Sequence, residues 1–175
     1  MRRTPPLVAL AGAVALLAGC GGTRTIVRTV QSPLNAGSGD LRIIGQIRSL
    51  TRVGDHYELR FDPEWFLSGI TANVALAQDL HQHCKPSACP PVPNDNYRVD
   101  ESHRTYVYIL PLWTHGTVLL RTSRGLTPGV RISAPQLARL LERRSRLKLF
   151  EPLSSGVWLQ VHVDTVRSFA QQYVP

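Results

Sequence analysis

The sequence predicts an α+β domain in which a small, mostly antiparallel sheet is curled or closed as a barrel and carries two helices. Several short segments alternate polar and apolar residues, which is typical of half-buried strands. Two other segments have apolar residues at helical spacing. The expected strands follow one another in pairs, whereas a parallel doubly wound sheet requires strict alternation of strand and helix.

The first expected element is a β-hairpin over residues 41–62, with its turn at Gly54 and Asp55. Glycine at the first of two turn positions is typical of such hairpins. In the second strand every other residue is apolar, which predicts one buried and one solvated face. The apolar members are Tyr57, Leu59 and Phe61.

We expect the second strand to end at Asp62-Pro63 and a turn to follow at residues 65–67, closed by Gly69. A helix is predicted over residues 71–82, because its apolar residues recur at helical spacing. Residues 83–96 contain four prolines and are expected to form a loop.

The second half of the domain predicts two strands, at residues 104–112 and 117–122, with a turn near His115-Gly116 between them. The glycines at 125 and 129 are assigned to turns. A helix is expected from Ala134 to about Arg146. Its start is indicated by Ser133 with Gln136 three residues later, the pattern of a capping box.

Two strands are expected to end the domain, one over residues 157–163 and one from Thr165. The alternation in the first of them predicts that four valine and leucine residues share one face. These are Val157, Leu159, Val161 and Val163.

The N-terminal residues have the order of a secretory signal, because two arginines precede a 12-residue apolar run from Leu7 to Ala18. That run is shorter than the roughly 20 residues that a membrane-spanning helix needs. Leu17-Ala18-Gly19-Cys20 resembles the lipobox of bacterial lipoproteins, in which a diacylglyceryl group is attached to the cysteine thiol and the chain is cut just before it. A simple secretory cleavage that leaves Cys20 unmodified is the alternative.

The lipobox resemblance implies the organisation of the whole chain. Residues 1–19 would be a lipoprotein signal peptide, residues 20–40 a lipidated Cys20 and flexible tether, and residues 41–175 a single β-rich domain. The protein would then lie at the cell membrane, held by its lipid anchor and facing the outside of the cytoplasm.

The chain is basic, with 20 Lys and Arg against 12 Asp and Glu and a net charge of +8. Such a charge suits nucleic acid, but an exported domain rarely meets it, so we expect no nucleic-acid partner. Cations gather toward the end of the second expected helix, where they either complement the helix dipole or bind anionic lipid or wall polymer. These cations are Arg139, Arg143, Arg144, Arg146 and Lys148.

Cys84 and Cys89 remain as an even pair once Cys20 carries a lipid, and in an oxidising compartment such a pair favours a disulfide. Together with His81 and His83 they also offer two thiolates and two imidazoles for a metal ion, and free thiols are the third alternative. We expect the disulfide, with no metal and no cofactor.

Residues 95–103 concentrate polar side chains, including Asp95, Asp100, Glu101 and His103. They could hold a cation or act in acid-base catalysis if they converged with Asp62, and Asx-turns and ordinary ion pairs are the alternative. Neither a nucleophile elbow nor a glycine-rich phosphate loop occurs, so no catalytic residue is assigned.

Three segments carry a wider resemblance. They are RFDPEWFLSGITANVA at 60–75, VPNDNYRVDESHR at 92–104 and LFEPLSSGVWLQVHVDTVRSFAQQYVP at 149–175. Together they resemble a group of small exported or lipid-anchored proteins of actinobacteria and related Gram-positive bacteria. The resemblance implies an envelope location and a β-rich fold, and supplies no catalytic residues.

The expected function is therefore that of a lipid-anchored extracytoplasmic protein, a non-catalytic binding or envelope-associated domain. The alternative is a small envelope enzyme or cation-binding protein that uses the Asp95–His103 loop. A cleft that joins Asp62 to that loop would favour the alternative.

Overall fold

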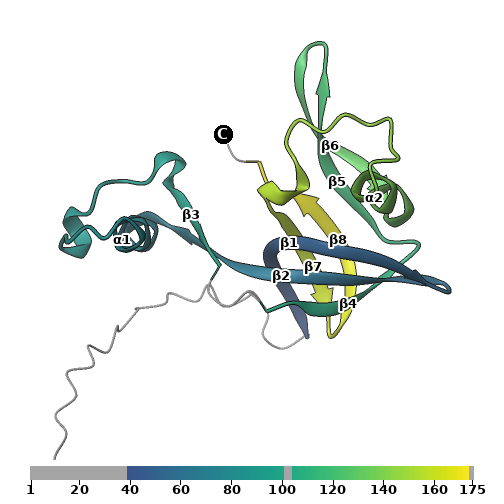
Figure 1. The fold of residues 1–175 in the computed structure, drawn as a ribbon, viewed down its shortest axis with the longest axis horizontal. Coiled ribbons are helices and arrows are strands. Elements are labelled where there is room, and N and C mark those ends of the chain that lie inside the picture. The colour runs from purple at the N-terminus through teal and green to yellow at the C-terminus, as the bar shows by residue number, and fades with distance from the viewer. Residues whose placement is uncertain (1–38, 101–103, 174–175) are drawn as a thin grey trace, which may run out of the picture.

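A computed structural model describes residues 39–100 and 104–173 of the chain. The elements form an α+β fold with a curled, mostly antiparallel sheet, so the predicted fold class is confirmed (Figure 1). In chain order they are β1 (Asp40–Val53), β2 (His56–Ser68), α1 (Gly69–Asp79), β3 (Asn96–Val99), β4 (Tyr106–Pro111), β5 (His115–Thr122), β6 (Gly125–Ser133), α2 (Ala134–Leu141), β7 (Val157–His162) and β8 (Thr165–Gln171).

Five strands close the sheet on itself. β1 pairs antiparallel with β2 on one side and with β7 on the other. β2 pairs with β4, β7 pairs with β8, and β4 meets β8 in parallel at Ile109 and Thr165. The ring therefore runs β1-β2-β4-β8-β7 and back to β1. β5 extends from β8 as a parallel neighbour and carries β6.

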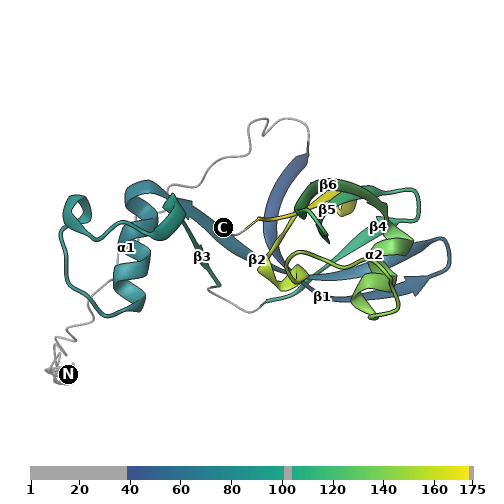
Figure 2. The same ribbon diagram turned by 90° about the horizontal axis from the view of Figure 1, so that it is seen from above.

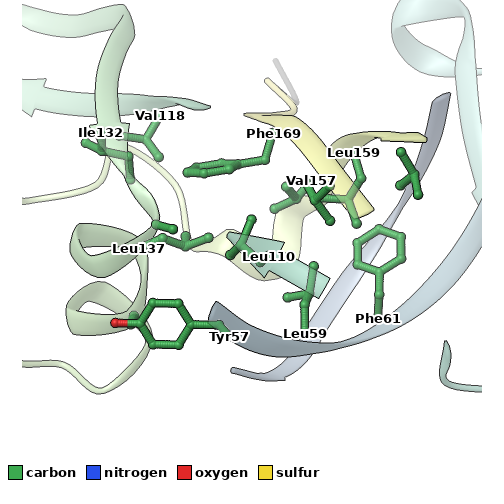
Figure 3. Close-up of a cluster of buried hydrophobic side chains, with 14 residues drawn as sticks. Tyr57, Leu59, Phe61, Leu110, Val118, Ile132, Leu137, Val157, Leu159 and Phe169 are labelled. Carbon is green, nitrogen blue, oxygen red and sulfur yellow. The ribbon is translucent and has the colours of Figure 1, made fainter. Parts of the chain in front are cut away.

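The interior of this ring is apolar. Tyr57, Leu59 and Phe61 are buried in β2, and Glu58 and Arg60 between them are exposed, as the predicted alternation requires. The alternation breaks at Asp62, which is buried. Figure 3 shows these side chains facing the cluster that β4, β7, β8 and α2 complete. The residues contributed by those elements include Leu110, Leu137, Val157, Leu159 and Phe169.

β2 does not end at Pro63, so that prediction is wrong. Pro63 pairs with Gly45 of β1, where a Cβ on Gly45 would lie 2.0 Å from the carbonyl oxygen of Asp62. Only glycine permits this close approach of two backbones. Residues 65–67 are likewise strand rather than turn, since they pair with β3.

Beyond Pro63, β2 leaves the barrel and enters an extension that we call the arm, residues 65–99. Figures 1 and 2 show β2 running from the barrel into the arm, where it carries β3 and α1. The predicted loop of residues 83–96 is irregular apart from two short 3₁₀ turns. The arm thus places α1 and this loop away from the barrel core.

Both helices end earlier than predicted and for the same reason. α1 ends at Asp79 because His81 adopts a left-handed conformation with φ of 55°. The amide of His81 then donates to the carbonyl of Gln78, and the amide of Gln82 donates to that of Ala77. This is the hydrogen-bond pattern of a Schellman motif, which usually has glycine at the left-handed position.

Strand β6 is missed by the sequence interpretation, which assigned Gly125 and Gly129 to turns. Gly125 is the first residue of β6, next to the turn at residues 123–124, and Gly129 lies inside the strand; their φ values are 99° and 68°. The pairing of β5 with β6 shifts register between Val118 and Leu120, so the strand bulges opposite that step. Glycine is common both at β-bulges and in turns, so the sequence alone does not distinguish the two.

Two smaller boundaries also differ. The turn between β4 and β5 lies at residues 112–114 rather than at His115-Gly116, and the amide of Thr114 closes it by donating to the carbonyl of Pro111 at 3.0 Å. The hydroxyl of buried Thr114 also donates to the carbonyl of Val166 at 3.1 Å. Val163 does not share the buried face of β7. It is 77% exposed, with φ of 57°, in the turn that leads to β8.

Candidate functional site

The start of α2 is positioned by the predicted capping box. The backbone amide of Ser133 donates to the side-chain oxygen of Gln136 at 2.8 Å. Ala134, Leu137 and Ala138 then turn one face of the helix into the core. The opposite face, with Gln136 and Arg139, is left exposed to solvent.

The helix ends at Leu141 and not at Arg146. Arg143 adopts a left-handed conformation with φ of 57°, and its amide donates to the carbonyl of Leu140 at 3.1 Å. The amide of Arg144 donates to the carbonyl of Arg139 at 2.8 Å. The chain therefore reverses at Arg143 and passes back beside the last turn of α2.

This reversal gathers three of the five predicted cations around one pocket of about 300 Å³. We call it the arginine pocket. Arg139 comes from the helix, and Arg144 and Arg146 come from the segment that follows the turn. The other lining residues are Gln136, Ser145 and Leu147, so no carboxylate lines it. Arg143 and Lys148 do not line it, although the sequence grouped them with the others.

The electrostatics of the arginine pocket are those of an anion site. The last carbonyls of α2 carry the negative end of the helix dipole, about half an elementary charge, and the three positive guanidinium groups outweigh it. The exposed carboxylate of Glu142 lies 3.3 Å from the guanidinium of Arg144, a surface pair worth less than about 1 kcal/mol. Nε of Arg139 donates to the carbonyl of Pro135 at 3.4 Å. Because a guanidinium has five N–H donors, Arg139 and Arg144 keep further donors for an external anion.

A second polar cluster lies where β2 leaves the barrel. Asp62 is only 1% exposed, and its Oδ2 accepts hydrogen bonds from Nε and Nη2 of Arg48, at 2.9 and 2.5 Å. Asp100 lies 3.9 Å from the same guanidinium. Asp62 and Asp100 thus share a cation, so these two of the residues whose convergence would favour the alternative function lie close together, in an arrangement of ordinary ion pairs.

The neighbouring carboxylate of Glu64 is also paired with an arginine. Its Oε1 accepts from the side-chain amide of Gln46 at 2.6 Å, and its Oε2 lies 3.1 Å from Arg98 of β3. The Glu64 side chain is 4% exposed. In both pairs the carboxylate is buried and its arginine partner is partly exposed, and the pair of Glu64 with Arg98 joins the barrel to the arm.

Asp95 does not join this cluster. Its Oδ1 accepts from the backbone amide of Gly69 at 3.1 Å, and Asn96 beside it pairs with Ser68. Ser68 lies six residues beyond Asp62 in β2, so the two aspartates are about 20 Å apart along the strand. Glu101 and His103, the other members of the predicted polar loop, lie outside the described residues.

Cys84 and Cys89 lie in the arm as a disulfide, with their sulfur atoms 1.98 Å apart. Val92, three residues on, donates its backbone amide to the side-chain oxygen of Asn73 at 2.8 Å, which ties the loop to α1. Among the described residues, no three His, Cys, Asp or Glu side chains gather as metal ligands. His81 and His83 are therefore not brought together with the cysteines as a metal site.

A larger groove, of about 480 Å³, lies on the outer face of β5 and β8. The sequence analysis did not assign it. Its lining comes from three separated stretches of the chain, residues 113–117, 131 and 167–170, and no spacing rule joins these in sequence. The residues are Trp113, His115, Gly116, Thr117, Arg131, Arg167, Ser168, Phe169 and Ala170.

Comparisons of the chain with protein-family models, with curated proteins and with solved structures found no match. The resemblance to exported and lipid-anchored proteins therefore stays a prediction. Cys20, on which the anchor depends, lies outside the described residues. Within the described ranges, the helices are too short or too polar to cross a bilayer.

Proposed function

We propose that this protein is a lipid-anchored, extracytoplasmic binding domain that rests on anionic envelope surfaces through its arginine pocket. One observation carries the proposal. The left-handed turn at Arg143 brings Arg139, Arg144 and Arg146 together around a pocket whose lining holds no carboxylate. Such a site suits the phosphate or carboxylate groups of lipid heads and wall polymers.

The energies involved are sufficient for a domain that is already tethered. Each basic side chain near an anionic membrane contributes on the order of 1 kcal/mol, and the attraction decays within a Debye length of about 8 Å at physiological salt. A lipid on Cys20 would keep the domain at a high effective concentration near the surface. Three weak contacts are then enough to orient it.

The anchor is tested on native membranes by mass spectrometry of the N-terminal peptide. We expect a mature chain that begins at Cys20 and carries acyl groups. A Cys20→Ala variant is expected to stay uncleaved and to lack them. An unmodified cysteine, or a mature chain that still contains residues 7–18, contradicts the lipid anchor.

Surface binding is tested separately, on residues 39–175 without lipid. Every described strand pairing lies within residues 40–171, so this segment contains the whole sheet. We expect co-sedimentation with anionic vesicles that falls at high salt and is absent with neutral vesicles. Replacing the three pocket arginines by glutamine should reduce binding at least tenfold.

The control variant removes the same charge outside the pocket and its turn, by replacing the exposed residues Arg60, Arg124 and Lys148 with glutamine. It should bind within about threefold of the parent, because a specific pocket depends on position rather than on net charge. Equal loss in the two triple variants would show that only overall charge matters and would refute the pocket. Failure of the parent to bind anionic vesicles would refute surface binding altogether.

A small envelope enzyme or cation-binding protein finds less support. Arg48 and Arg98 occupy the buried carboxylates of Asp62 and Glu64, and Asp95 lies at the far end of β2 in the arm. The arginine pocket has no such competing partner among its lining residues.

A further inference from the structure

The groove on the outer face of β5 and β8, which we call the tryptophan groove, has a composition unlike that of the arginine pocket. Trp113 stands at its edge with 59% of its surface exposed. Two arginines and one histidine line it, and none of its lining residues is acidic. The groove therefore combines a flat apolar ring with positive charge, two features that a ligand with a ring and an anionic group would use together.

A β-bulge in β8 places one of these cations, Arg167. In the pairing of β7 with β8, Gln160 is opposite Ser168, and Val161 is opposite Val166. Arg167 is therefore the extra residue of a β-bulge, a device that redirects a side chain out of the regular alternation. Ser168 and Ala170, which follow it, lie beside His115 and Thr117 of β5.

The second cation comes from the other neighbour of β5. Arg131 of β6 pairs directly with Thr117, so its side chain lies on the same face of the sheet. Within the described ranges, no hydrogen bond or ion pair engages the side chains of Trp113, Arg131 or Arg167. Their charges and the indole face are thus available to a ligand.

From this geometry we propose that the tryptophan groove binds an acidic saccharide, meaning a sugar ring that bears a carboxylate or a phosphate group. The apolar C–H face of a sugar ring packs on an exposed indole, and guanidinium groups bind carboxylate and phosphate. The hydroxyl of Thr117 can donate to and accept from ring hydroxyls, and the hydroxyl of Ser168, which donates to Oε1 of Gln160 at 3.3 Å, can still accept. The volume of about 480 Å³ is within the range of small-molecule sites.

Single-stranded nucleic acid is the main competing ligand, since it also combines flat rings with phosphates. Proteins that bind it supply several aromatic platforms along a basic track, one for each stacked base. This groove offers a single exposed aromatic side chain and a short lining. An envelope location, which rests on the proposed function, also supplies acidic polysaccharides rather than nucleic acid.

The test is calorimetric titration of the full chain in neutral detergent with four probes. They are a short oligogalacturonate, a sugar phosphate, a neutral cello-oligosaccharide and an oligothymidylate. We expect at least one acidic saccharide to bind, and the neutral one to bind at least tenfold more weakly or not at all. Comparison of the oligogalacturonate, which bears carboxylates, with the sugar phosphate shows which acidic group the groove accepts.

Variants connect the binding to the groove. Trp113→Ala, and Arg131→Gln together with Arg167→Gln, should each weaken binding at least tenfold, whereas Trp113→Phe keeps a flat ring and should cost less. The matched control is Arg60→Gln with Arg124→Gln, which removes the same charge elsewhere on the exposed surface. All these side chains are exposed, so the fold should not depend on them.

Four results would overturn the proposal: equal binding of the neutral saccharide, tighter binding of the oligothymidylate, equal loss in the control variant, or no binding of any probe. The arginine-pocket triple variant separates this outcome from the proposed function. It should lose vesicle binding and keep saccharide binding, while Trp113→Ala should do the reverse.

Discussion

Arg48 lies at a β-bulge of β1, and its guanidinium contacts the buried carboxylate of Asp62 in β2. The pairing of β1 with β2 shifts register between Ile47 and Ser49, so Arg48 has no direct partner in the ladder. Both Nε and Nη2 reach the same carboxylate oxygen. The arginine at this bulge therefore neutralises the charge of Asp62, which is buried where β2 leaves the barrel.

Removing Arg48 should be strongly destabilising, because Asp62 would remain buried without its cation. We expect Arg48→Met to lower the free energy of unfolding by about 2–4 kcal/mol in urea denaturation. The double variant Arg48→Met with Asp62→Leu should recover a large part of that loss, since no charge is then buried. A double variant that is less stable than Arg48→Met would show that the pair does not act through charge neutralisation.

The disulfide is expected to act locally in the arm. Its loop is short, so the chain-entropy model assigns it about 2 kcal/mol. In a Cys84→Ser, Cys89→Ser variant, hydrogen exchange should accelerate at α1 and around Val92, whose amide is bonded to Asn73. Exchange in β7 and β8 should be unchanged. Uniform acceleration through the barrel would mean that the arm and the barrel unfold as one unit.

Tyr97 provides a pH dependence in the arm. Its hydroxyl donates to Oδ2 of Asp79 at 2.8 Å, and this hydrogen bond, with a smaller effect of burial, raises the pKa of Tyr97 above its ordinary value of 10.0. The contribution to stability is therefore complete below pH 10 and is lost as the pH rises through the folded-state pKa. In an NMR titration, Asp79→Asn should lower the pKa of Tyr97. An unchanged pKa would contradict the assigned cause.

Arg143 tests the turn that builds the arginine pocket. A left-handed conformation costs a non-glycine residue about 1 kcal/mol, so Arg143→Gly should raise the free energy of unfolding by up to about that amount. Arg144→Gly, at a position without positive φ, should instead lower it by about 0.5–1 kcal/mol. Thermal denaturation of both variants gives the comparison. Destabilisation by Arg143→Gly would indicate that the arginine side chain itself holds the turn.

Local patterns in the sequence determined the elements whose causes are local. The alternation through Tyr57, Leu59 and Phe61 and the turn at Gly54 predict the first hairpin, and both appear in the structure. The capping box of Ser133 and Gln136 predicts the start of α2, because both partners lie within one helical turn. Together with the pairing of strands, these patterns were enough for the fold class.

Tertiary structure decided the elements whose causes are distant in the chain. β2 continues through Pro63 because Gly45 on another strand makes room for it. Two residues beyond its end, each helix is followed by a non-glycine residue, His81 or Arg143, in a left-handed conformation that its own propensity does not predict. The same turn at Arg143 divided five predicted cations into three that line a pocket and two that do not.

The tryptophan groove most clearly separates what the sequence determines from what the tertiary structure determines. Trp113, Arg131 and Arg167 are far apart in the sequence, and each is an ordinary surface residue when taken alone. They meet because β5 pairs with β6 on one side and with β8 on the other, and because a bulge turns Arg167 outward. The residue types in the sequence determined which chemical groups the chain offers. Long-range strand pairing determined where these groups meet, because each strand pairs with a partner that is distant in the sequence.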